Sequence, residues 1–386
     1  HLYCTMFMLK FLLCFFGDSC TQIQVNGVCT PLPLCKPVLE EIDRAGRPMP
    51  MYMRRKLQSL TCGFHAKEPM VGISFLRQNT PTTESEDNID NDFIRITDDE
   101  GVGPKDVSKH PNLSLLPTKC GRIGDDKILN GQKAGLAEMP WMVLLTYISR
   151  PTGLVELNCA GTLINQWYVL TAAHCVTNLS TRLLLDGVIL GEYDLTTDPD
   201  CAVDDDGDYC VPTSRNVTIE KVIAHPNYSP NRFHENDIAL LRLSEPADLT
   251  LENVKAICLP ITPEIQTESL QGNKGTVTGW GRTEHDQQSP VLLKVDLPII
   301  SVADCTKAYS AFNSRWKLCA GGEKDSDSCS GDSGGPLIFA GVLDTGRNIQ
   351  RGIVSFGTKP CGIGRLPGVY TNVAYYMDWI LDNIRS

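Results

Sequence analysis

Three polar residues of this chain lie in sequence contexts that suit nucleophilic catalysis. Ser333 sits in Asp-Ser-Cys-Ser-Gly-Asp-Ser-Gly-Gly-Pro, residues 327–336, a glycine-rich turn where the backbone can approach a reacting carbonyl. A hydroxyl is a poor nucleophile unless a neighbouring base takes its proton, and histidine suits that role near neutral pH. His174, in Leu-Thr-Ala-Ala-His-Cys, offers the base. Asp237, in Asn-Asp-Ile-Ala-Leu-Leu, offers a carboxylate that would hold the imidazole in the right tautomer.

The backbone beside Ser333 is expected to stabilise negative charge on the attacked carbonyl oxygen. The N–H groups of Gly331 and Ser333 would form this oxyanion hole, which accounts for a glycine at position 331. Each residue alone has an ordinary interpretation, as a core histidine, a capping aspartate or a serine in a turn. Three matching sequence contexts in one chain would rarely arise by chance, so the sequence predicts a Ser-His-Asp triad.

The overall composition narrows the class of protein. A net charge of -11 over 386 residues, with no long Lys/Arg run, argues against binding to nucleic acid. The 16 cysteines are spread along the chain, which favours disulfides in an oxidising compartment over a zinc site. The apolar run Met6–Phe16 is too short to span a bilayer and predicts a secretory signal peptide, with a buried N-terminal strand as the alternative. We therefore expect a secreted, extracellular protein that binds no membrane.

Composition also divides the chain into regions. Residues 1–19 hold upstream residues and the signal peptide, and residues 20–75 hold four cysteines but too few apolar residues for a core without disulfides. Residues 76–127 are polar and acidic, which predicts a linker ending in an activation segment. Over 128–386, short Val/Ile/Leu/Tyr runs alternate with Gly, Pro, Asn and Asp clusters, which indicates an all-β barrel or sandwich. Helical spacing of apolar residues over 375–384 predicts a terminal helix.

The C-terminal two-thirds of the chain resembles a trypsin-like serine protease of the chymotrypsin family. The triad follows the chymotrypsin order and not that of subtilisin or the α/β-hydrolases. Further matches are Pro140-Trp141, Cys159-Ala-Gly161, Thr278-Gly-Trp-Gly281, Ser355-Phe-Gly357 and Pro367-Gly-Val-Tyr370. The resemblance implies an all-β fold of two six-stranded antiparallel barrels with a C-terminal helix, and a triad in the cleft between the barrels.

The resemblance also implies a specificity pocket. Asp327 falls where trypsin-like members carry the acidic base of the S1 pocket, and Gly357 and Gly368 fall on the pocket walls. A carboxylate at the end of a narrow slot needs a long cation, so cleavage after Arg or Lys is expected. A surface loop residue is the alternative interpretation of Asp327.

Activation by cleavage follows from the same resemblance. In this family a cut after a basic residue frees an α-amino group, which inserts and pairs with the aspartate beside the nucleophile. Here the cut would fall between Lys127 and Ile128, and the new amino group would pair with Asp332. An unpartnered buried carboxylate is costly, so this pair would order the oxyanion hole and the S1 pocket. Because position 127 is a lysine, the activator should itself be trypsin-like.

Disulfide pairing is likewise implied by family analogy. The implied bonds are Cys159–Cys175, Cys305–Cys319, Cys329–Cys361, Cys120–Cys258 and Cys201–Cys210. The bond from Cys120 to Cys258 would keep the N-terminal part attached after activation. The bridged acidic insertion between Cys201 and Cys210 is typical of the clip-domain proteases of arthropods.

The N-terminal module resembles that same group in part. Cys20, Cys29, Cys35 and Cys62 match the first four cysteines of a clip domain, while Val-Gly-Ile-Ser stands at residues 71–74, near the place of the last two. The clip pairing then leaves Cys29–Cys62 as the bond that can form. A truncated clip and an error in the sequence near residue 72 both account for the missing pair.

Two further features concern ligands and modification. Glu192 and Asp194 follow Leu190-Gly and resemble the calcium loop of some trypsins and clip proteases, so they are candidate ligands of a structural Ca²⁺, with a solvated acidic loop as the alternative. The chemistry itself requires no cofactor. Asn-X-Ser/Thr sequons, which are candidate glycosylation sites of a secreted chain, begin at Asn112, Asn178, Asn216 and Asn227.

The resemblance implies a zymogen that acts in an extracellular innate-immune cascade, in haemolymph if the source is an arthropod. Its implied partners are an upstream trypsin-like activator, serpin-type inhibitors, and protein substrates with Arg or Lys at the cleaved bond. Prophenoloxidase, whose activation leads to melanisation, and a Toll-type cytokine precursor are the implied substrates. A digestive or general trypsin and a non-catalytic homologue that acts as a cofactor are the alternatives, and an intact Ser333 argues against the second.

Overall fold

The structure is a computed structural model. It describes the backbone of residues 19–22, 25–31, 61–65 and 68–74, together with residues 103–122, 134–204, 207–231, 233–282, 288–309, 316–322, 331–340, 346–357 and 366–386. Contacts between residues divide the chain into two units, residues 1–97 and 98–386. In the described part of the chain, no helix is long and apolar enough to cross a membrane.

The first unit contains a four-stranded antiparallel sheet in the order β1-β2-β4-β3. Its strands are β1 (Ser19–Gln22), β2 (Val25–Pro31), β3 (Thr61–His65) and β4 (Glu68–Ser74). Cys29 on β2 is opposite Gly72 of β4, and Cys62 lies at a register shift where β3 pairs with the other edge of β4. The side chains of this sheet lie outside the described residues, and so does the expected Cys29–Cys62 bond.

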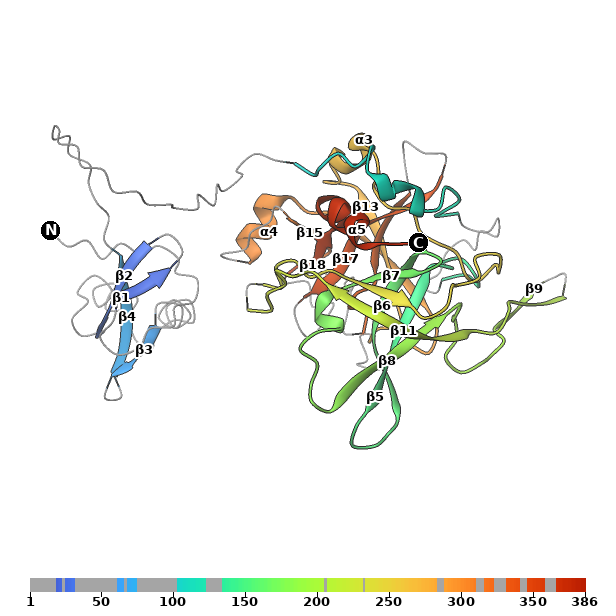
Figure 1. Ribbon diagram of the computed structural model, residues 1–386, viewed down its shortest axis with the longest axis horizontal. Helices are drawn as coiled ribbons and strands as arrows, with labels where there is room; N and C mark the ends of the chain where they lie inside the picture. The colour runs from blue at the N-terminus through green and yellow to red at the C-terminus, as the bar shows by residue number, and fades with distance from the viewer. Residues whose placement is uncertain are drawn as a thin grey trace. The chain divides into compact units, whose positions relative to one another are not determined.

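The second unit begins with a closed six-stranded barrel in the order β11-β12-β7-β6-β5-β8, whose ladders are all antiparallel. Its strands are β5 (Met142–Ser149), β6 (Val155–Asn165), β7 (Tyr168–Thr171), β8 (Leu183–Leu190), β11 (Arg215–Ala224) and β12 (Ala239–Leu243). Between β8 and β11, the hairpin of β9 (Cys201–Asp204) and β10 (Gly207–Cys210) projects away from the barrel (Figure 1).

A second six-stranded antiparallel sheet follows, in the order β14-β13-β16-β17-β18-β15. Its strands are β13 (Lys274–Gly279), β14 (Leu293–Pro298), β15 (Lys317–Ala320), β16 (Pro336–Ala340), β17 (Asn348–Phe356) and β18 (Gly368–Asn372). An antiparallel bridge between Ile299 and Ala320 joins the two ends of this sheet. The helices among the described residues are η2 (Pro111–Leu115), η3 (Ala173–Cys175), α3 (Pro263–Thr267), α4 (Val302–Ala308), η5 (Val373–Tyr376) and α5 (Met377–Asn383). The expected all-β class, the two six-stranded barrel-like sheets and the terminal helix are confirmed.

Strand β16 lies between two hydrophobic cores. Successive side chains of a strand point to opposite faces of its sheet. Leu337 and Phe339 pack into the core of the second sheet, whereas Ile338 packs into the larger core that the first barrel dominates. The loop that carries Ser333 directly precedes β16, so this packing holds the predicted nucleophile at the junction of the two sheets. Figure 1 shows the green strands of the first barrel below the orange and red strands of the second sheet.

Part of the predicted linker is packed onto the second unit. We expected residues 76–127 to be a solvated linker and activation segment, but Val107 is 2% exposed and Leu113 and Leu115 contact the main core. Lys105 forms an ion pair with Asp378 of α5 (Nζ–Oδ2 2.6 Å). The region is polar on average, so its composition did not indicate these few apolar residues. Their packing is sufficient to hold residues 103–122 against the main core.

Four of the implied disulfides lie among the described residues, and each joins the two cysteines that family analogy paired. They are Cys120–Cys258, Cys159–Cys175, Cys201–Cys210 and Cys305–Cys319. The first connects residues 103–122 to the rest of the second unit. Cys329 and Cys361 lie outside the described residues.

The four sequons differ in accessibility. The asparagines at 178, 216 and 227 are exposed, whereas Asn112 is half-buried. The side-chain amide of Asn112 donates a hydrogen bond to the carbonyl oxygen of Leu381 at 2.8 Å. A glycan would therefore meet less obstruction at the three exposed asparagines than at Asn112.

Candidate active site

His174 is fixed by a short turn at the end of β7. The η3 turn begins one residue after that strand and contains His174 itself. Ala172 and Ala173 are fully buried, because small side chains let the turn lie close to the barrel. The neighbouring Cys175 is bonded to Cys159 on β6, which attaches the turn to a second strand. The side chain of His174 is 21% exposed, so its ring is open to a substrate on one side.

Asp237 lies in a tight turn just before β12. The preceding residue, Asn236, has φ 54°, a left-handed conformation that asparagine tolerates better than most residues. The Asp237 side chain is completely buried and accepts hydrogen bonds at both oxygens. The backbone N–H of His174 donates to Oδ1 at 2.9 Å, and His174 Nδ1 lies 2.8 Å from Oδ2. This arrangement fixes both the position of the imidazole and the nitrogen that carries its proton.

The electrostatic surroundings keep Asp237 ionised. Burial by itself raises the pKa of this carboxyl group, because a charge is costly to remove from water. The charge of His174, its hydrogen bond, the Lys317 ammonium and the Ser355 hydroxyl act in the opposite direction and prevail. The pKa of Asp237 therefore falls to about 2, and the group is a carboxylate at neutral pH.

Hydrogen bonds hold the Ser333 loop to both sheets. The N–H of Ala160, on β6, donates to the carbonyl oxygen of Ser333 at 2.8 Å, and the N–H of Gly334 donates to that of Val354 on β17 at 2.9 Å. Ala160 adjoins Cys159, whose disulfide partner adjoins His174. The three predicted triad residues are thus attached to the same part of the first barrel, although they come from distant segments of the chain.

Gly331 and Asp332 complete the loop. Gly331 has φ 107°, a conformation that is open to glycine and strained for residues with a side chain. The N–H of Gly281 donates to Asp332 Oδ1 at 2.9 Å, and a Cβ on Gly281 would come within 2.5 Å of that oxygen. The Asp332 carboxylate therefore lies against the Trp280-Gly281 turn. Lys127 and Ile128, the predicted cleavage site and partner of Asp332, lie outside the described residues.

Gly334→Ala is expected to destabilise the folded chain by more than ~2 kcal/mol and to displace Ser333. Gly334 has φ 79°, where an L-residue is strained, and an added Cβ would collide with Thr171 Oγ1 and the carbonyl oxygen of Ala160. Gly272→Ala is the matched control, because Gly272 has φ 83° but no atom of the described residues within 4 Å of an added Cβ. Chemical denaturation of both variants checks this result, and equal destabilisation by the two would contradict the proposed collision.

Two of the three predicted S1 residues lie among the described residues and face each other. Gly357 follows β17 and Gly368 begins β18. Among the described atoms, a Cβ on Gly357 would meet the Cα of Gly368 at 3.9 Å, an ordinary van der Waals contact. Phe356, beside Gly357, contacts the ring of Tyr309 edge-on at 5.6 Å between centroids. Asp327, the predicted acidic base of the pocket, lies outside the described residues.

The structure adds two residues to the site that no sequence motif marked. Lys317 is 5% exposed, and burial lowers its pKa to about 8. The ring of His234 stacks on Phe356 at 5.7 Å and meets the ring of His174 edge-on at 5.4 Å, and burial lowers the pKa of His234. Lysine is mostly a surface residue, so an isolated lysine in a sequence gives no signal of such a position.

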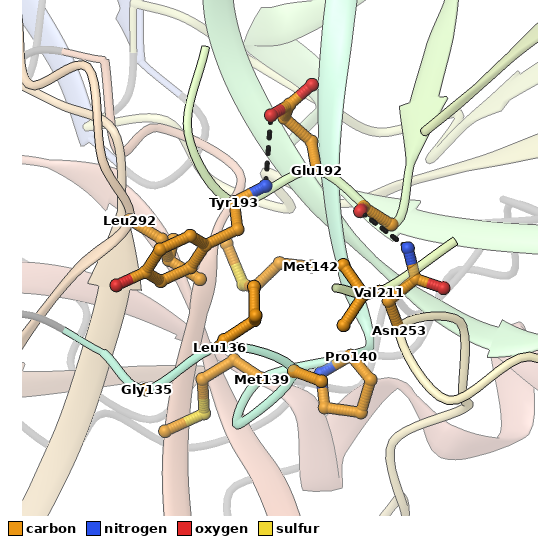
Figure 2. A pocket seen from close by; sticks show the side chains of 12 residues that line it. Gly135, Leu136, Met139, Pro140, Met142, Glu192, Tyr193, Val211, Asn253 and Leu292 are labelled. Carbon is orange, nitrogen blue, oxygen red and sulfur yellow. Dashed lines mark hydrogen bonds between the residues drawn. The ribbon is translucent and has the colours of Figure 1, made fainter. Parts of the chain in front are cut away.

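Glu192 and Asp194, the candidate calcium ligands, follow β8. Glu192 accepts a hydrogen bond from the N–H of Tyr193 at 3.0 Å, and the pKa of Glu192 is raised by burial and by Asp200. Asp194 accepts hydrogen bonds from Thr196. Figure 2 shows Glu192 and Tyr193 among the residues that line a pocket, and the triad residues are not part of that lining.

Ca²⁺ prefers six to eight oxygen ligands. Among the described side chains, neither Glu192 nor Asp194 belongs to a cluster of three groups that could hold a metal ion. The two residues do not by themselves complete a calcium site, and calcium binding stays a prediction.

Comparison with known proteins gives a consistent set of relatives. The family model described as Trypsin matches residues 128–380. Serine protease ea of Drosophila melanogaster is 40% identical over 73% of this chain and 74% of its own length. Phenoloxidase-activating factor 1 of Holotrichia diomphalia is 36% identical over 93% of this chain and 91% of its own length. The crystal structure of the Drosophila Grass clip serine protease of the Toll pathway matches with a TM-score of 0.64 and 32% identity, covering 95% of this chain and 97% of that one.

Proposed function

The chain belongs to the clip-domain branch of the trypsin family of serine proteases, and we propose that it is a secreted zymogen of an active endopeptidase. The observation that carries the proposal is the buried Asp237 carboxylate, which binds both the backbone N–H and the Nδ1 of His174. A histidine held this way presents Nε2 as a base. The loop that carries Ser333 is hydrogen-bonded to β6, because the N–H of Ala160 donates to the carbonyl oxygen of Ser333.

The reaction uses these groups in sequence. Ser333 Oγ attacks the carbonyl carbon of the scissile peptide while His174 Nε2 accepts the hydroxyl proton. The carbonyl oxygen becomes an oxyanion, which the N–H groups of Gly331 and Ser333 stabilise. His174 then gives the proton to the leaving amine, the C–N bond breaks, and an acyl-enzyme remains. A water molecule then attacks the acyl-enzyme in the same way, with His174 as the base, and the carboxylic acid product leaves Ser333.

The proposed specificity is for Arg or Lys before the cleaved bond. Gly357 and Gly368 face each other without side chains that would obstruct a long substrate side chain, which supports the proposed pocket. Asp327 at its base would pair with the cation of the substrate. Protein chains with Arg or Lys at an exposed site are therefore the proposed substrates.

Cleavage at Lys127–Ile128 is the proposed activation step. Asp332 already lies against the Trp280-Gly281 turn, so pairing with the new amino group would fix the loop that carries Gly331 and Ser333. The Cys120–Cys258 disulfide would keep the N-terminal part joined to the enzyme after the cut.

An extracellular immune cascade is the proposed setting. The relatives include a phenoloxidase-activating factor and a protease of the Toll pathway, and the alignments with both span the N-terminal region as well as the catalytic part. A phenoloxidase precursor or a cytokine precursor is then the proposed substrate, and serpin-type proteins are the proposed inhibitors. The extended N-terminal part favours this role over that of a digestive trypsin.

Activation of the full chain by bead-bound trypsin, followed by removal of the beads, tests the proposal. We expect amidase activity on Arg and Lys chromogenic peptides, and none on Phe peptides, to appear only after cleavage at Lys127. Lys127→Gln should remain inactive under the same treatment. Verified cleavage at Lys127 without activity would contradict the proposal and favour the non-catalytic homologue.

A further inference from the structure

Lys317, the first residue of β15, holds a buried ammonium group beside the triad. The whole residue is 5% exposed, which is rare for lysine because an unpaired buried charge is costly. Its three N–H donors have three acceptors. Lys317 Nζ donates to the carbonyl oxygen of His234 at 2.7 Å, to Ser355 Oγ at 3.1 Å and to Thr371 Oγ1 at 3.1 Å.

Both hydroxyl groups that accept from Lys317 donate in turn to the catalytic aspartate. Ser355 Oγ donates to Asp237 Oδ2 at 2.6 Å, and Thr371 Oγ1 donates to the Asp237 carbonyl oxygen at 2.9 Å. Each hydroxyl has a single proton to donate. Since an ammonium group can only donate, it occupies one lone pair of each hydroxyl and leaves the hydroxyl proton directed at Asp237.

We propose that Lys317 is a positioning residue for the triad: it sets the direction of both hydroxyl donors to Asp237 and supplies a fixed positive charge behind the carboxylate. Asp237 in turn orients His174 through the bond at 2.8 Å. The inference rests on the proposed endopeptidase function and adds to it a residue that touches neither substrate nor reacting atoms.

The charges around Lys317 determine its expected pH behaviour. Asp237 and Glu235 attract the ammonium group and raise its pKa, while the larger effect of burial lowers it. The ring of Phe356 lies 6.0 Å from Nζ. His234, which contributes its carbonyl oxygen, has an imidazole whose own pKa is lowered by burial and, in smaller part, by Lys317. The cation is therefore present at neutral pH and is lost on the alkaline side.

Loss of the cation has two expected effects on catalysis. Without it, the Ser355 and Thr371 hydroxyls are free to turn away from Asp237, so the imidazole is held less well and kcat falls. A fixed positive charge also disfavours a second cation in the active site, so its removal should move the acid limb of the pH–rate profile to higher pH. KM should stay unchanged, because Lys317 is buried beneath the site and away from bound substrate.

Lys317→Met keeps a chain of similar length and removes the charge and all three donors. For the activated full chain we expect about a tenfold fall in kcat, an unchanged KM, and an acid limb of the pH–rate profile that moves up by about half a unit. Lys317→Gln, which is polar and uncharged, provides a second variant in case the first does not fold. Lys255→Met is the control, since Lys255 also donates to two carbonyl oxygens but lies away from the triad.

The low-field NMR signal of the His174 Nδ1 proton gives a readout that does not depend on turnover. In the Lys317 variants this signal should move upfield, because a less firmly held imidazole forms a longer Nδ1–Oδ2 hydrogen bond to Asp237. Unchanged kcat with an unchanged signal would overturn the inference, as would a loss of activity with an unchanged signal in the folded fraction, which indicates a structural role alone. Absence of activity in the unaltered activated chain would instead overturn the proposed function, while the NMR signal would still test Lys317.

Discussion

Ser333→Ala is expected to lower kcat on Arg and Lys chromogenic peptides by about 10⁶-fold, close to complete loss. The triad acts as a unit, so a chain without the hydroxyl cannot form the acyl-enzyme, whatever the state of His174 and Asp237. Folding should be unaffected, because the fixed groups of this loop are the carbonyl oxygen of Ser333 and the N–H of Gly334. The measurement is the initial rate after activation with bead-bound trypsin, compared with an equal amount of the unaltered chain.

A covalent probe sharpens this experiment. A fluorophosphonate should label the activated chain at Ser333 and should not label Ser333→Ala. Ser244→Ala is the control, because Ser244 is exposed and hydrogen-bonded to Thr218 on the surface of the first barrel. Activity retained by Ser333→Ala would contradict the assignment of the nucleophile, provided that the same preparation shows no labelling from residual trypsin.

Asp237→Asn should lower kcat by about 10⁴-fold, a magnitude typical of a triad that loses its orienting carboxylate. An amide has one acceptor atom and one donor atom, whereas the site presents donors to both oxygens of Asp237. The amide nitrogen therefore faces a donor in either orientation, and one orientation favours the wrong tautomer of His174. Asp248→Asn, at an exposed aspartate that hydrogen-bonds within its own turn, should leave kcat unchanged. Full activity of Asp237→Asn would contradict the triad.

The same variant tests the depressed pKa of Asp237. With a pKa of about 2 in the folded chain against about 3.8 unfolded, the carboxylate contributes stability that is fully present above about pH 4 and is lost as the pH falls toward 2. The contribution is about 2 kcal/mol. We therefore expect the free energy of unfolding to fall more steeply between pH 4 and 2 in the unaltered chain than in Asp237→Asn. Parallel curves from chemical denaturation would show that Asp237 has an ordinary pKa.

Features that a few neighbouring residues determine could be predicted from the sequence. The all-β class follows from short alternating strands, and the contexts of His174, Asp237 and Ser333 each depend on a few neighbouring residues. Lys317 was not predictable, because its burial depends on the pairing of β15 with β18 and on the contact of its side chain with Ser355 of β17, both distant in sequence. Residues 103–122 were assigned to a solvated linker because averaged polarity gave no weight to Val107 and the leucines that pack on the core.

The Cys120–Cys258 disulfide has a consequence for a chain cut at the proposed Lys127–Ile128 bond and then diluted. Two fragments held by contacts alone would separate in a large fluid volume, at a rate set by their dissociation constant. Joined by this bond, the N-terminal part stays at an effective concentration fixed by the length of the connecting chain. Anything bound by the sheet of the first unit would then be presented to the catalytic unit at that local concentration, however dilute the enzyme.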